Sequence, residues 1–258
     1  MSDDPSSTRR AGVSTSPRTA AMWAAVDEVV RARSDELQRP LRVIDLGGGT
    51  GGLAVPLAVS GHDVTVVDPS PDALASLRRR AAEAQASSRV SAVQGDADTL
   101  SSLVGRDQPD LVLCHGTLEY VDDPATTLAQ VAAVLPPGGI LSLVVPQRAG
   151  AVVARALAGQ FAQARAAMER PDGRWGDADP VPRRFDRDGI IALLETAGLT
   201  TTRAHGIRIF SDLVPSVLVD SDADRAALLD LERAVATHPD FAALADLGTS
   251  LHVIATRA

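Results

Sequence analysis

The stretch from Val43 to Gly52 constrains the fold more than any other part of the chain. A short apolar run with one acid, Val43-Ile44-Asp45-Leu46, leads into five glycines within six residues. Glycine adopts positive φ easily and lets the backbone approach a ligand without a Cβ in the way. A strand that runs into a glycine loop and then a helix is how open α/β sheets hold nucleotide-like ligands. The stretch therefore predicts a nucleotide-cofactor loop.

Strand and helix patterns alternate strictly up to residue 145. A first helix is expected to open at Gly51, and others at Ser70-Pro71-Asp72 and Asp123-Pro124. At the last two, an N-cap side chain followed by proline is typical of a helix start. Apolar runs that predict strands cover residues 41–46, 64–67, 90–93, 110–114 and 140–145. Such alternation is typical of a parallel sheet with right-handed crossovers. The chain is therefore expected to adopt an α/β fold.

The alternation breaks after residue 146. An alanine-rich helix is expected over 151–168, and the polar stretch 169–184, rich in Pro, Gly and Asp, predicts a functional loop or a lid. Two further helices are expected over 186–197 and 222–237, and strands over 200–210 and 247–255. The N-terminal residues 1–16 have the composition of a disordered arm. We therefore expect one domain over 17–258, with a lid insertion at about 147–185.

Composition excludes several classes of protein. The formal net charge of −8 argues against a strongly basic nucleic-acid surface, although a local patch is compatible with it. The single cysteine, Cys114, excludes a disulfide scaffold, and no zinc spacing is present, so we expect no metal site. No secretory signal and no membrane-length apolar run are seen, so a cytoplasmic protein is expected. The sequence does not indicate the oligomeric state.

Two acids decide which cofactor the glycine loop would hold. Gly47, Gly49 and Gly52 fit the dinucleotide pattern, but Asp45 near the end of the first strand is unfavourable beside a pyrophosphate. An acid there suits a ligand with an ammonium and a sulfonium group. Asp68, at the end of the second strand, is placed to bind ribose hydroxyls. A nicotinamide oxidoreductase and a cofactor-binding protein without catalysis are two classes that stay open.

Four features together resemble class I S-adenosylmethionine-dependent methyltransferases. They are the Asp45 loop, Asp68, Gly95-Asp96-Ala97 and Leu135-Pro136-Pro137-Gly138-Gly139. The resemblance implies a Rossmann-like sheet of seven mostly parallel strands with helices on both faces and an antiparallel last strand. It implies S-adenosyl-L-methionine as cofactor, held by Asp45, Gly47, Gly48, Gly49 and Asp68. The adenine amine would bind Asp96 in the general pattern of these enzymes, whereas the resemblance to one of their families favours Asp98.

A closer resemblance is to the tRNA 5-carboxymethoxyuridine methyltransferases, which methylate the carboxylate of a modified wobble uridine. It is carried by Arg18 with Trp23 and by residues 115–124, 206–212, 229–232 and 251–253. It implies tRNA as a partner and cofactor contacts at Arg18, Gly47, Gly48, Asp68, Ala97, Asp98 and His115. The chain departs from that family at 145–150 and 169–175, where the family has an aromatic residue, a histidine and a basic run. This departure keeps a small-molecule acid or hydroxyl open as the alternative acceptor, because basic side chains supply much of the affinity for nucleic acid.

The chemistry needs few catalytic groups. A carboxylate nucleophile is ionised at neutral pH and needs no general base, whereas a hydroxyl would need one, with His115 as the candidate. His115 could also contact the cofactor or position the substrate. Arg148, Arg183 and Arg208 are candidate contacts of an anionic substrate. Glu119 and Tyr120 are expected to shape the entry to the following helix rather than take part in chemistry.

Overall fold

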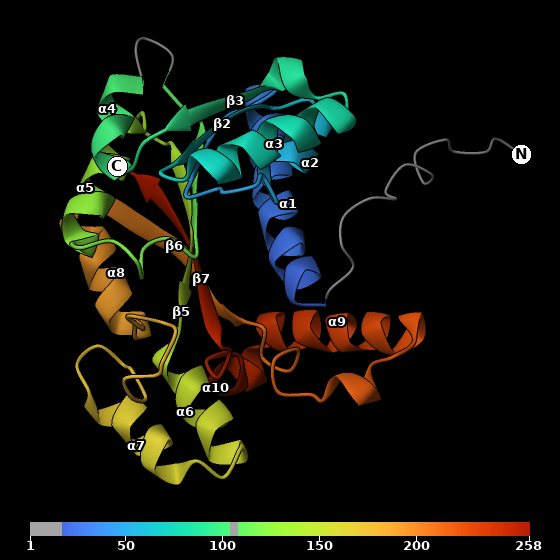
Figure 1. The fold of residues 1–258 in the computed structure, drawn as a ribbon, viewed down its shortest axis with the longest axis vertical. Coiled ribbons are helices and arrows are strands. Elements are labelled where there is room, and N and C mark those ends of the chain that lie inside the picture. The colour runs from blue at the N-terminus through green and yellow to red at the C-terminus, as the bar shows by residue number, and fades with distance from the viewer. Residues whose placement is uncertain (1–16, 104–107) are drawn as a thin grey trace, which may run out of the picture.

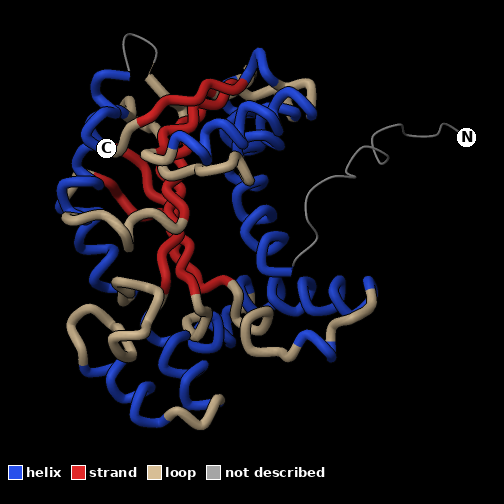
Figure 2. Tube along the Cα trace, viewed as in Figure 1, coloured by secondary structure: helices blue, strands red, loops and turns tan. Residues whose placement is uncertain are grey.

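The computed structural model describes residues 17–103 and 108–258, so the predicted N-terminal arm lies outside the described residues. One seven-stranded sheet runs through the molecule in the order β3-β2-β1-β4-β5-β7-β6 (Figures 1 and 2). Its strands are β1 (Arg42–Leu46), β2 (Asp63–Asp68), β3 (Val90–Gln94), β4 (Leu111–His115), β5 (Ile140–Pro146), β6 (Leu199–Ile207) and β7 (Ser250–Arg257).

Strand direction follows the predicted pattern. The pairs among β1 to β5 are all parallel, whereas β7 is antiparallel to both β5 and β6. The predicted seven-stranded sheet with an antiparallel last strand is therefore confirmed. Since β7 runs against its neighbours, its first residues lie at the edge of the sheet where the parallel strands end.

Helices cover both faces of the sheet (Figure 1). One face packs against α4 (Leu100–Leu103), α5 (Pro124–Val134) and α8 (Arg187–Thr196), with Val131 and Ile190 fully buried. The other face packs against α1 (Pro17–Leu37), α2 (Ala54–Val59) and α3 (Pro71–Glu83), with Val26 and Leu77 fully buried. Strands buried on both faces explain the continuous apolar runs in the sequence.

The predicted helix starts at Ser70 and Asp123 are confirmed. The Ser70 hydroxyl accepts a hydrogen bond from the Ala73 amide at 3.2 Å, and the Asp123 carboxylate accepts one from the Ala125 amide at 3.0 Å. Each cap satisfies a backbone donor that has no partner within its helix. The chain therefore leaves β2 and the loop after β4 in fixed directions, which positions the loops that follow these two strands.

Two predicted elements differ in the structure. The single helix expected over 151–168 is wrong, because the chain forms α6 (Arg148–Leu157) and α7 (Phe161–Glu169). Gly159 between them has a φ of 72°, a conformation that ends a helix. The strand expected to reach residue 210 ends at Ile207, because Arg208 turns into the left-handed region with a φ of 60°. The predicted division into one domain with a lid over 147–185 stays a prediction.

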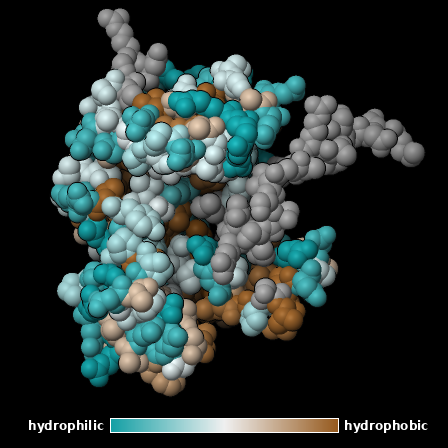
Figure 3. Space-filling model, viewed as in Figure 1, coloured by the Kyte–Doolittle hydropathy of each residue, from teal (hydrophilic) through white to brown (hydrophobic). Residues whose placement is uncertain are grey.

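Most of the large exposed apolar side chains come from two segments. The first segment is α6 and α7, with Leu157, Phe161 and Met168. The second runs through η4 (Ser216–Leu218), α9 (Asp222–Thr237) and η5 (Pro239–Phe241), and it contributes Val217, Leu218, Leu231 and Phe241. Figure 3 shows apolar surface over the α9 region, while most of the same face is hydrophilic. The short helix α10 (Ala242–Ala245) then leads to β7. Within the described residues, every helix is too short or too polar to cross a bilayer.

Candidate functional site

The glycine loop turns tightly against the ends of two strands. Gly47, Gly49 and Gly51 all have positive φ, and the Gly47 amide donates to the Val67 carbonyl at 2.7 Å. A Cβ on Gly47 would lie 2.1 Å from the Thr117 hydroxyl oxygen. The glycines are therefore needed both for the backbone conformation and for the close approach of the loop to the segment after β4.

Asp45 is a buried acid with an unpartnered oxygen. Its side chain is 2% exposed, and its Oδ2 atom has no hydrogen-bond partner among the described residues. Burial raises the pKa of Asp45 to about 7, and the nearby charge of Asp68 raises it further in the same direction. A buried polar atom without a partner is costly, so this carboxyl is suited to a cationic group that arrives with a ligand.

Asp68 holds the glycine loop and the next helix together. Its Oδ2 atom accepts a hydrogen bond from the Gly49 amide and its Oδ1 atom accepts one from the Ser70 amide, both at 2.9 Å. The carboxylate is 8% exposed. These contacts fix it at the carboxyl end of β2, and each oxygen keeps a second lone pair. This position is compatible with the binding of ribose hydroxyls, and that role of Asp68 stays a prediction.

The two acids after β3 differ in what they contact. The Asp96 carboxylate caps the short helix η3 (Ala97–Thr99) by accepting from the Asp98 amide at 3.0 Å. Ala97 is buried, and the Asp98 side chain is exposed, with no hydrogen bond or ion pair to another side chain in the described part of the chain. Since Asp96 already serves the backbone, Asp98 is the acid with the freer carboxylate.

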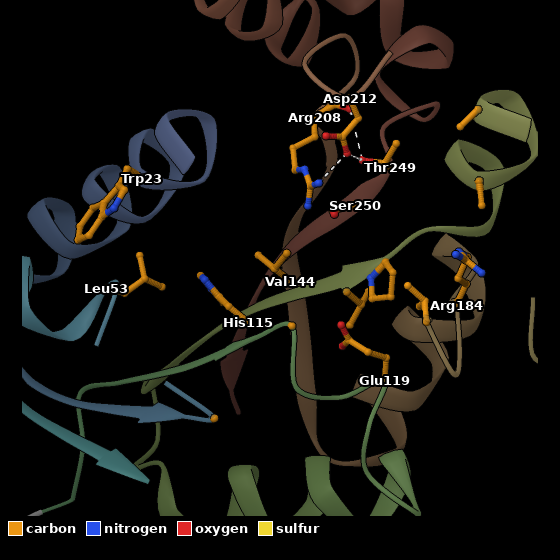
Figure 4. A pocket seen from close by; sticks show the side chains of 18 of the residues that line it. Trp23, Leu53, His115, Glu119, Val144, Arg184, Arg208, Asp212, Thr249 and Ser250 are labelled. Atoms are coloured by element: carbon orange, nitrogen blue, oxygen red, sulfur yellow. Dashed lines mark hydrogen bonds and ion pairs between the residues drawn. The ribbon is translucent and has the colours of Figure 1, made fainter. Parts of the chain in front are cut away.

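A cavity of about 550 Å³ lies at the edge of the sheet where β1 and β4 end (Figure 4). One end, here called the glycine-loop end, is lined by Trp23, Asp45, Gly47, Gly48, Gly52 and Leu53. The other, called the arginine end, is lined by Ala151, Ala154, Arg155, Val181, Arg184, Arg208 and Asp212. His115, Glu119 and Val144 lie between the two ends (Figure 4).

The cavity brings together some of the predicted residues and not others. Asp45, Gly47, Gly48, His115 and Arg208 line it. Other predicted cofactor residues lie outside its lining, along the same edge of the sheet towards β3, namely Gly49, Asp68, Asp96, Ala97 and Asp98. Arg148 and Arg183 also lie outside the lining, since they bond to the carbonyls of Pro171 and Val121 respectively. Arg18 lies in α1, but its side chain is outside the described part of the structure.

Two of the three arginines at the arginine end are paired with acids. Arg184 is 9% exposed and makes a two-pronged ion pair with the fully buried side chain of Asp179. Arg208 pairs with Asp212 at 2.7 Å, and Asp212 also accepts a hydrogen bond from the Thr249 hydroxyl. Both guanidinium groups are therefore held in place, with their charge largely balanced.

Arg155 is the third arginine, and its charge is not balanced. Its guanidinium carbon lies 4.3 Å from the centre of the Trp175 ring, and it donates to the side-chain oxygens of Gln160 and Gln163. No carboxylate pairs with it among the described residues. Neutral partners orient a cation without cancelling its charge, so Arg155 leaves a net positive charge at the cavity wall.

Glu232 fixes the loop that carries Arg208. This buried carboxylate on α9 accepts hydrogen bonds from three successive backbone amides, those of Ile209 at 3.0 Å and of Phe210 and Ser211 at 2.8 Å. The left-handed conformation of Arg208 directs the chain into this clamp. No local signal in the sequence indicates this role of Glu232, because residues 208–211 and α9 are brought together only in the folded chain.

A row of histidines crosses the sheet next to the cavity. His115, Val144, His252 and His205 are paired in register on β4, β5, β7 and β6. The Ser142 hydroxyl lies 2.9 Å from Nε2 of both His115 and His252, and the His252 and His205 rings meet edge-on at 5.2 Å. Burial lowers the pKa of His115 and of His205 to about 4, and that of His252 well below its usual range. The three imidazoles are therefore neutral at physiological pH.

We predict that His252→Gln reduces the acid sensitivity of the fold. An unfolded histidine takes up a proton below pH 6.5, whereas folded His252 does not, so stability is lost as the pH falls below 6.5. A glutamine amide can still reach Ser142 but does not titrate. Between pH 7.5 and pH 5, the variant should lose about 1–2 kcal/mol less unfolding free energy than the wild type. Urea unfolding at both pH values checks this, and equal losses would contradict it.

The fold and the site together define a class of enzyme. A sheet of order β3-β2-β1-β4-β5-β7-β6 with antiparallel β7, a glycine loop after β1 and an acid ending β2 is the architecture of class I S-adenosylmethionine-dependent methyltransferases. The unpartnered Asp45 carboxyl fits the ammonium group of that cofactor, and Gly47 and Gly48 line the cavity beside it without a side chain.

Comparisons with known proteins agree with this class. A family described as "Methyltransferase domain" matches residues 19–204. The tRNA 5-carboxymethoxyuridine methyltransferase of Escherichia coli (strain K12) is 30% identical over 240 residues, which cover 93% of this chain and 88% of the relative. An uncharacterised methyltransferase of Mycobacterium tuberculosis (strain ATCC 25618 / H37Rv) is 33% identical over 187 residues, 72% of this chain and 64% of the relative.

A solved structure shows the same fold. The magnesium protoporphyrin IX methyltransferase of Synechocystis PCC 6803 with bound SAH superimposes with a TM-score of 0.59 at 18% identity, covering 94% of this chain and 86% of that one. The chain therefore belongs to the methyltransferase-domain family. It is an S-adenosylmethionine-dependent methyltransferase, with S-adenosylmethionine as its cofactor.

Proposed function

We propose that this enzyme transfers the methyl group to a carboxylate, namely that of a 5-carboxymethoxyuridine at the wobble position of tRNA. The observation that carries the proposal is the uncompensated charge of Arg155 at the arginine end of the cavity. The 30% identity to the Escherichia coli enzyme over 93% of the chain supports the particular acceptor. A tRNA acceptor also agrees with the cytoplasmic location expected from the sequence.

In this proposal the cofactor occupies the glycine-loop end. Asp45 pairs with its ammonium group, Gly47 and Gly48 let the backbone approach it, and Asp68 binds its ribose. Asp98 accepts from the adenine amine, and Arg18 binds the carboxylate of the methionine part as a two-pronged cation. When bound, the cofactor supplies an electrophilic methyl group on a positively charged sulfur.

The protein then contributes alignment and the exclusion of water. A carboxylate acceptor and a sulfonium donor have opposite charges that cancel as the methyl group moves, so a cavity shielded from water favours the reaction. No proton has to be removed from a carboxylate. His115 suits this chemistry, because its low pKa makes it a weak base and its bond to Ser142 fixes its ring. We therefore assign His115 a positioning role.

The segment 147–185 favours an anionic acceptor in an otherwise acidic chain. It contains seven arginines and four acids, although the whole chain has a net charge of −8. Four of these arginines are paired with acids, in the pairs Arg148–Asp186, Arg165–Glu169, Arg170–Asp172 and Arg184–Asp179. Of the remaining three, Arg155 is the one that lines the cavity. A planar guanidinium there can bind a carboxylate or a phosphate through two parallel hydrogen bonds.

We predict that Arg155→Gln impairs binding of the acceptor but not binding of the cofactor. Loss of one charge-assisted contact should raise the KM for tRNA about tenfold to a hundredfold, while the affinity for S-adenosylhomocysteine stays unchanged. The KM of Arg155→Lys should lie between those of the wild type and Arg155→Gln, since lysine keeps the charge but lacks the planar guanidinium group. Arg165→Gln, at an exposed position on α7, is the matched control and should leave both values unchanged. Equal KM values for Arg155→Gln and wild type would refute the role of Arg155.

The proposed reaction is tested with labelled cofactor and tRNA that contains 5-carboxymethoxyuridine. We expect label to enter the tRNA and to be released by mild alkali, because a methyl ester hydrolyses under conditions that leave methylated bases and ethers intact. Wild-type enzyme that leaves this tRNA unlabelled would overturn the proposal. Alkali-stable label would show that another atom accepts the methyl group.

A small-molecule acid or hydroxyl is the second candidate acceptor. It is favoured by the pairing of most arginines of segment 147–185 with acids, which lowers the positive charge available to a nucleic-acid backbone. A salt titration separates the two candidates. The KM for tRNA should rise steeply with salt concentration, whereas transfer to a small molecule should respond weakly.

A further inference from the structure

We propose that Glu119 is a substrate-binding residue whose protonated carboxyl group donates a hydrogen bond to the acceptor carboxylate, at the oxygen that is not methylated. The proposal rests on the proposed function only in that the acceptor is a carboxylate. Glu119 lines the middle of the cavity and points into it between His115 and Arg184 (Figure 4). Its side chain is 8% exposed, and its Oε2 atom has no partner among the described residues.

The segment after β4 holds Glu119 in this position. The Thr117 hydroxyl donates to the Leu46 carbonyl at 3.0 Å, and the Tyr120 amide donates to the Thr117 carbonyl at 3.0 Å. Leu118 is fully buried in the core below the turn. The carboxyl group therefore reaches the cavity from a turn anchored to β1, and it can bind a ligand without rearrangement of the backbone.

The charges around Glu119 favour the protonated form. No cation pairs with this carboxyl within the described structure, because Arg184 and Arg208 are paired with Asp179 and Asp212. Burial raises the pKa of Glu119 to about 7, so about half of the side chains carry a proton at neutral pH. The other ionisable groups that line the cavity or adjoin Glu119 are Asp45, Cys114, His115 and Arg155.

Binding of a carboxylate would complete the protonation of Glu119. Two ionised carboxyl groups in contact repel each other, whereas a carboxyl and a carboxylate share a strong hydrogen bond. In the reaction, the other acceptor oxygen forms a bond to the methyl carbon, and the bond from that carbon to sulfur breaks with its electron pair left on sulfur. The Glu119 proton stays on Glu119, and no proton is released.

Calorimetry tests the inference without turnover. The nucleoside 5-carboxymethoxyuridine is titrated into protein saturated with S-adenosylhomocysteine at pH 8, in buffers with different heats of ionisation. Wild type should take up a proton on binding, approaching about 0.9 per site, because about a tenth of Glu119 is protonated beforehand. Glu119→Gln should bind the nucleoside with no proton uptake. Binding to wild type without uptake, or no binding at all, would overturn the inference.

The pH dependence of methyl transfer gives a second test. Above pH 7, kcat/KM of the wild type should fall towards tenfold per pH unit, whereas Glu119→Gln, which keeps a donor that does not titrate, should show a flat profile. Unfolding in urea and affinity for S-adenosylhomocysteine serve as controls for folding. A wild-type rate that rises with pH, together with inactive Glu119→Gln, would show instead that Glu119 is a general base for a hydroxyl, and the inference would be wrong.

The two tests also separate this inference from the proposed function. Alkali-labile label in tRNA without proton uptake would refute the role of Glu119 and leave the reaction intact. Proton uptake with the nucleoside but no label in tRNA would support Glu119 and show that another carboxylic acid is the acceptor.

Discussion

Replacing Asp45 with asparagine should weaken the binding of S-adenosylhomocysteine about tenfold to a hundredfold at pH 8. The product has the same ammonium group as the cofactor, and the variant cannot supply the negative charge that we assign to pair with it. The unliganded variant should be at least as stable as the wild type, because the buried Asp45 carboxyl has an oxygen without a partner. Calorimetric titration and urea unfolding measure the two effects separately.

The pH dependence of the same affinity provides the control. The pKa of Asp45 is raised to about 7, so below that pH the ligand must bind a protein that is mostly protonated at this site. Wild-type affinity should therefore rise almost tenfold per unit from pH 5 towards pH 7 and then level off. The Asp45→Asn variant should lack this rise. A wild-type affinity that is constant over the range, or an equal rise in both proteins, would show that Asp45 does not bind the ammonium group.

Asp179→Ala should destabilise the fold by about 3–5 kcal/mol, because it leaves the buried guanidinium of Arg184 without its carboxylate. The variant also removes the acceptor of two backbone amides, those of Trp175 at 2.9 Å and Val181 at 3.1 Å. Methyl transfer should fall with it, since Arg184 and Val181 line the arginine end. Urea unfolding gives the change in free energy.

A double variant serves as the matched control for this pair. Asp179→Leu with Arg184→Met replaces both charges by apolar groups and should recover much of the lost stability, since no buried charge then lacks a partner. Affinity for S-adenosylhomocysteine should stay close to the wild-type value in all of these variants. An Asp179→Ala protein within about 1 kcal/mol of wild type would mean that Arg184 finds solvent or another partner.

The fold was largely predictable because its signals are local. The parallel strands are short apolar runs, two of them lead to recognisable helix starts at Ser70 and Asp123, and the glycine loop marks the first crossover. The break between α6 and α7 was missed, because alanine-rich sequence on both sides of Gly159 hides a single left-handed residue. The turn at Arg208 was missed because an arginine rarely adopts positive φ and nothing local to it indicates the clamp by Glu232.

The positions of the candidate residues were predictable where they follow directly from a strand. Asp45, Asp68 and His115 stand at or next to strand ends, and these ends meet at one edge of a parallel sheet, whereas their roles towards the cofactor stay predictions. The histidine row was not predictable, because it depends on the register of strands that are up to 137 residues apart in the sequence, from His115 to His252. The unpaired charge of Arg155 was not predictable for a related reason. The sequence shows which arginines a helix contains, but not which of them lies near a carboxylate in the folded chain.

The antiparallel direction of β7 has a consequence for how such enzymes diversify. It brings Thr249 and Ser250 to the same edge as the ends of β4 and β5, so the C-terminal part of the chain reaches the cavity from the arginine side. The residues named for the glycine-loop end fall within 23–53, whereas the arginine end and its border are formed by residues 151–212 and by Thr249 and Ser250. In the proposed arrangement, substitutions in the second half of the gene can therefore alter the choice of acceptor while the first half, to which we assign the methyl donor, stays unchanged.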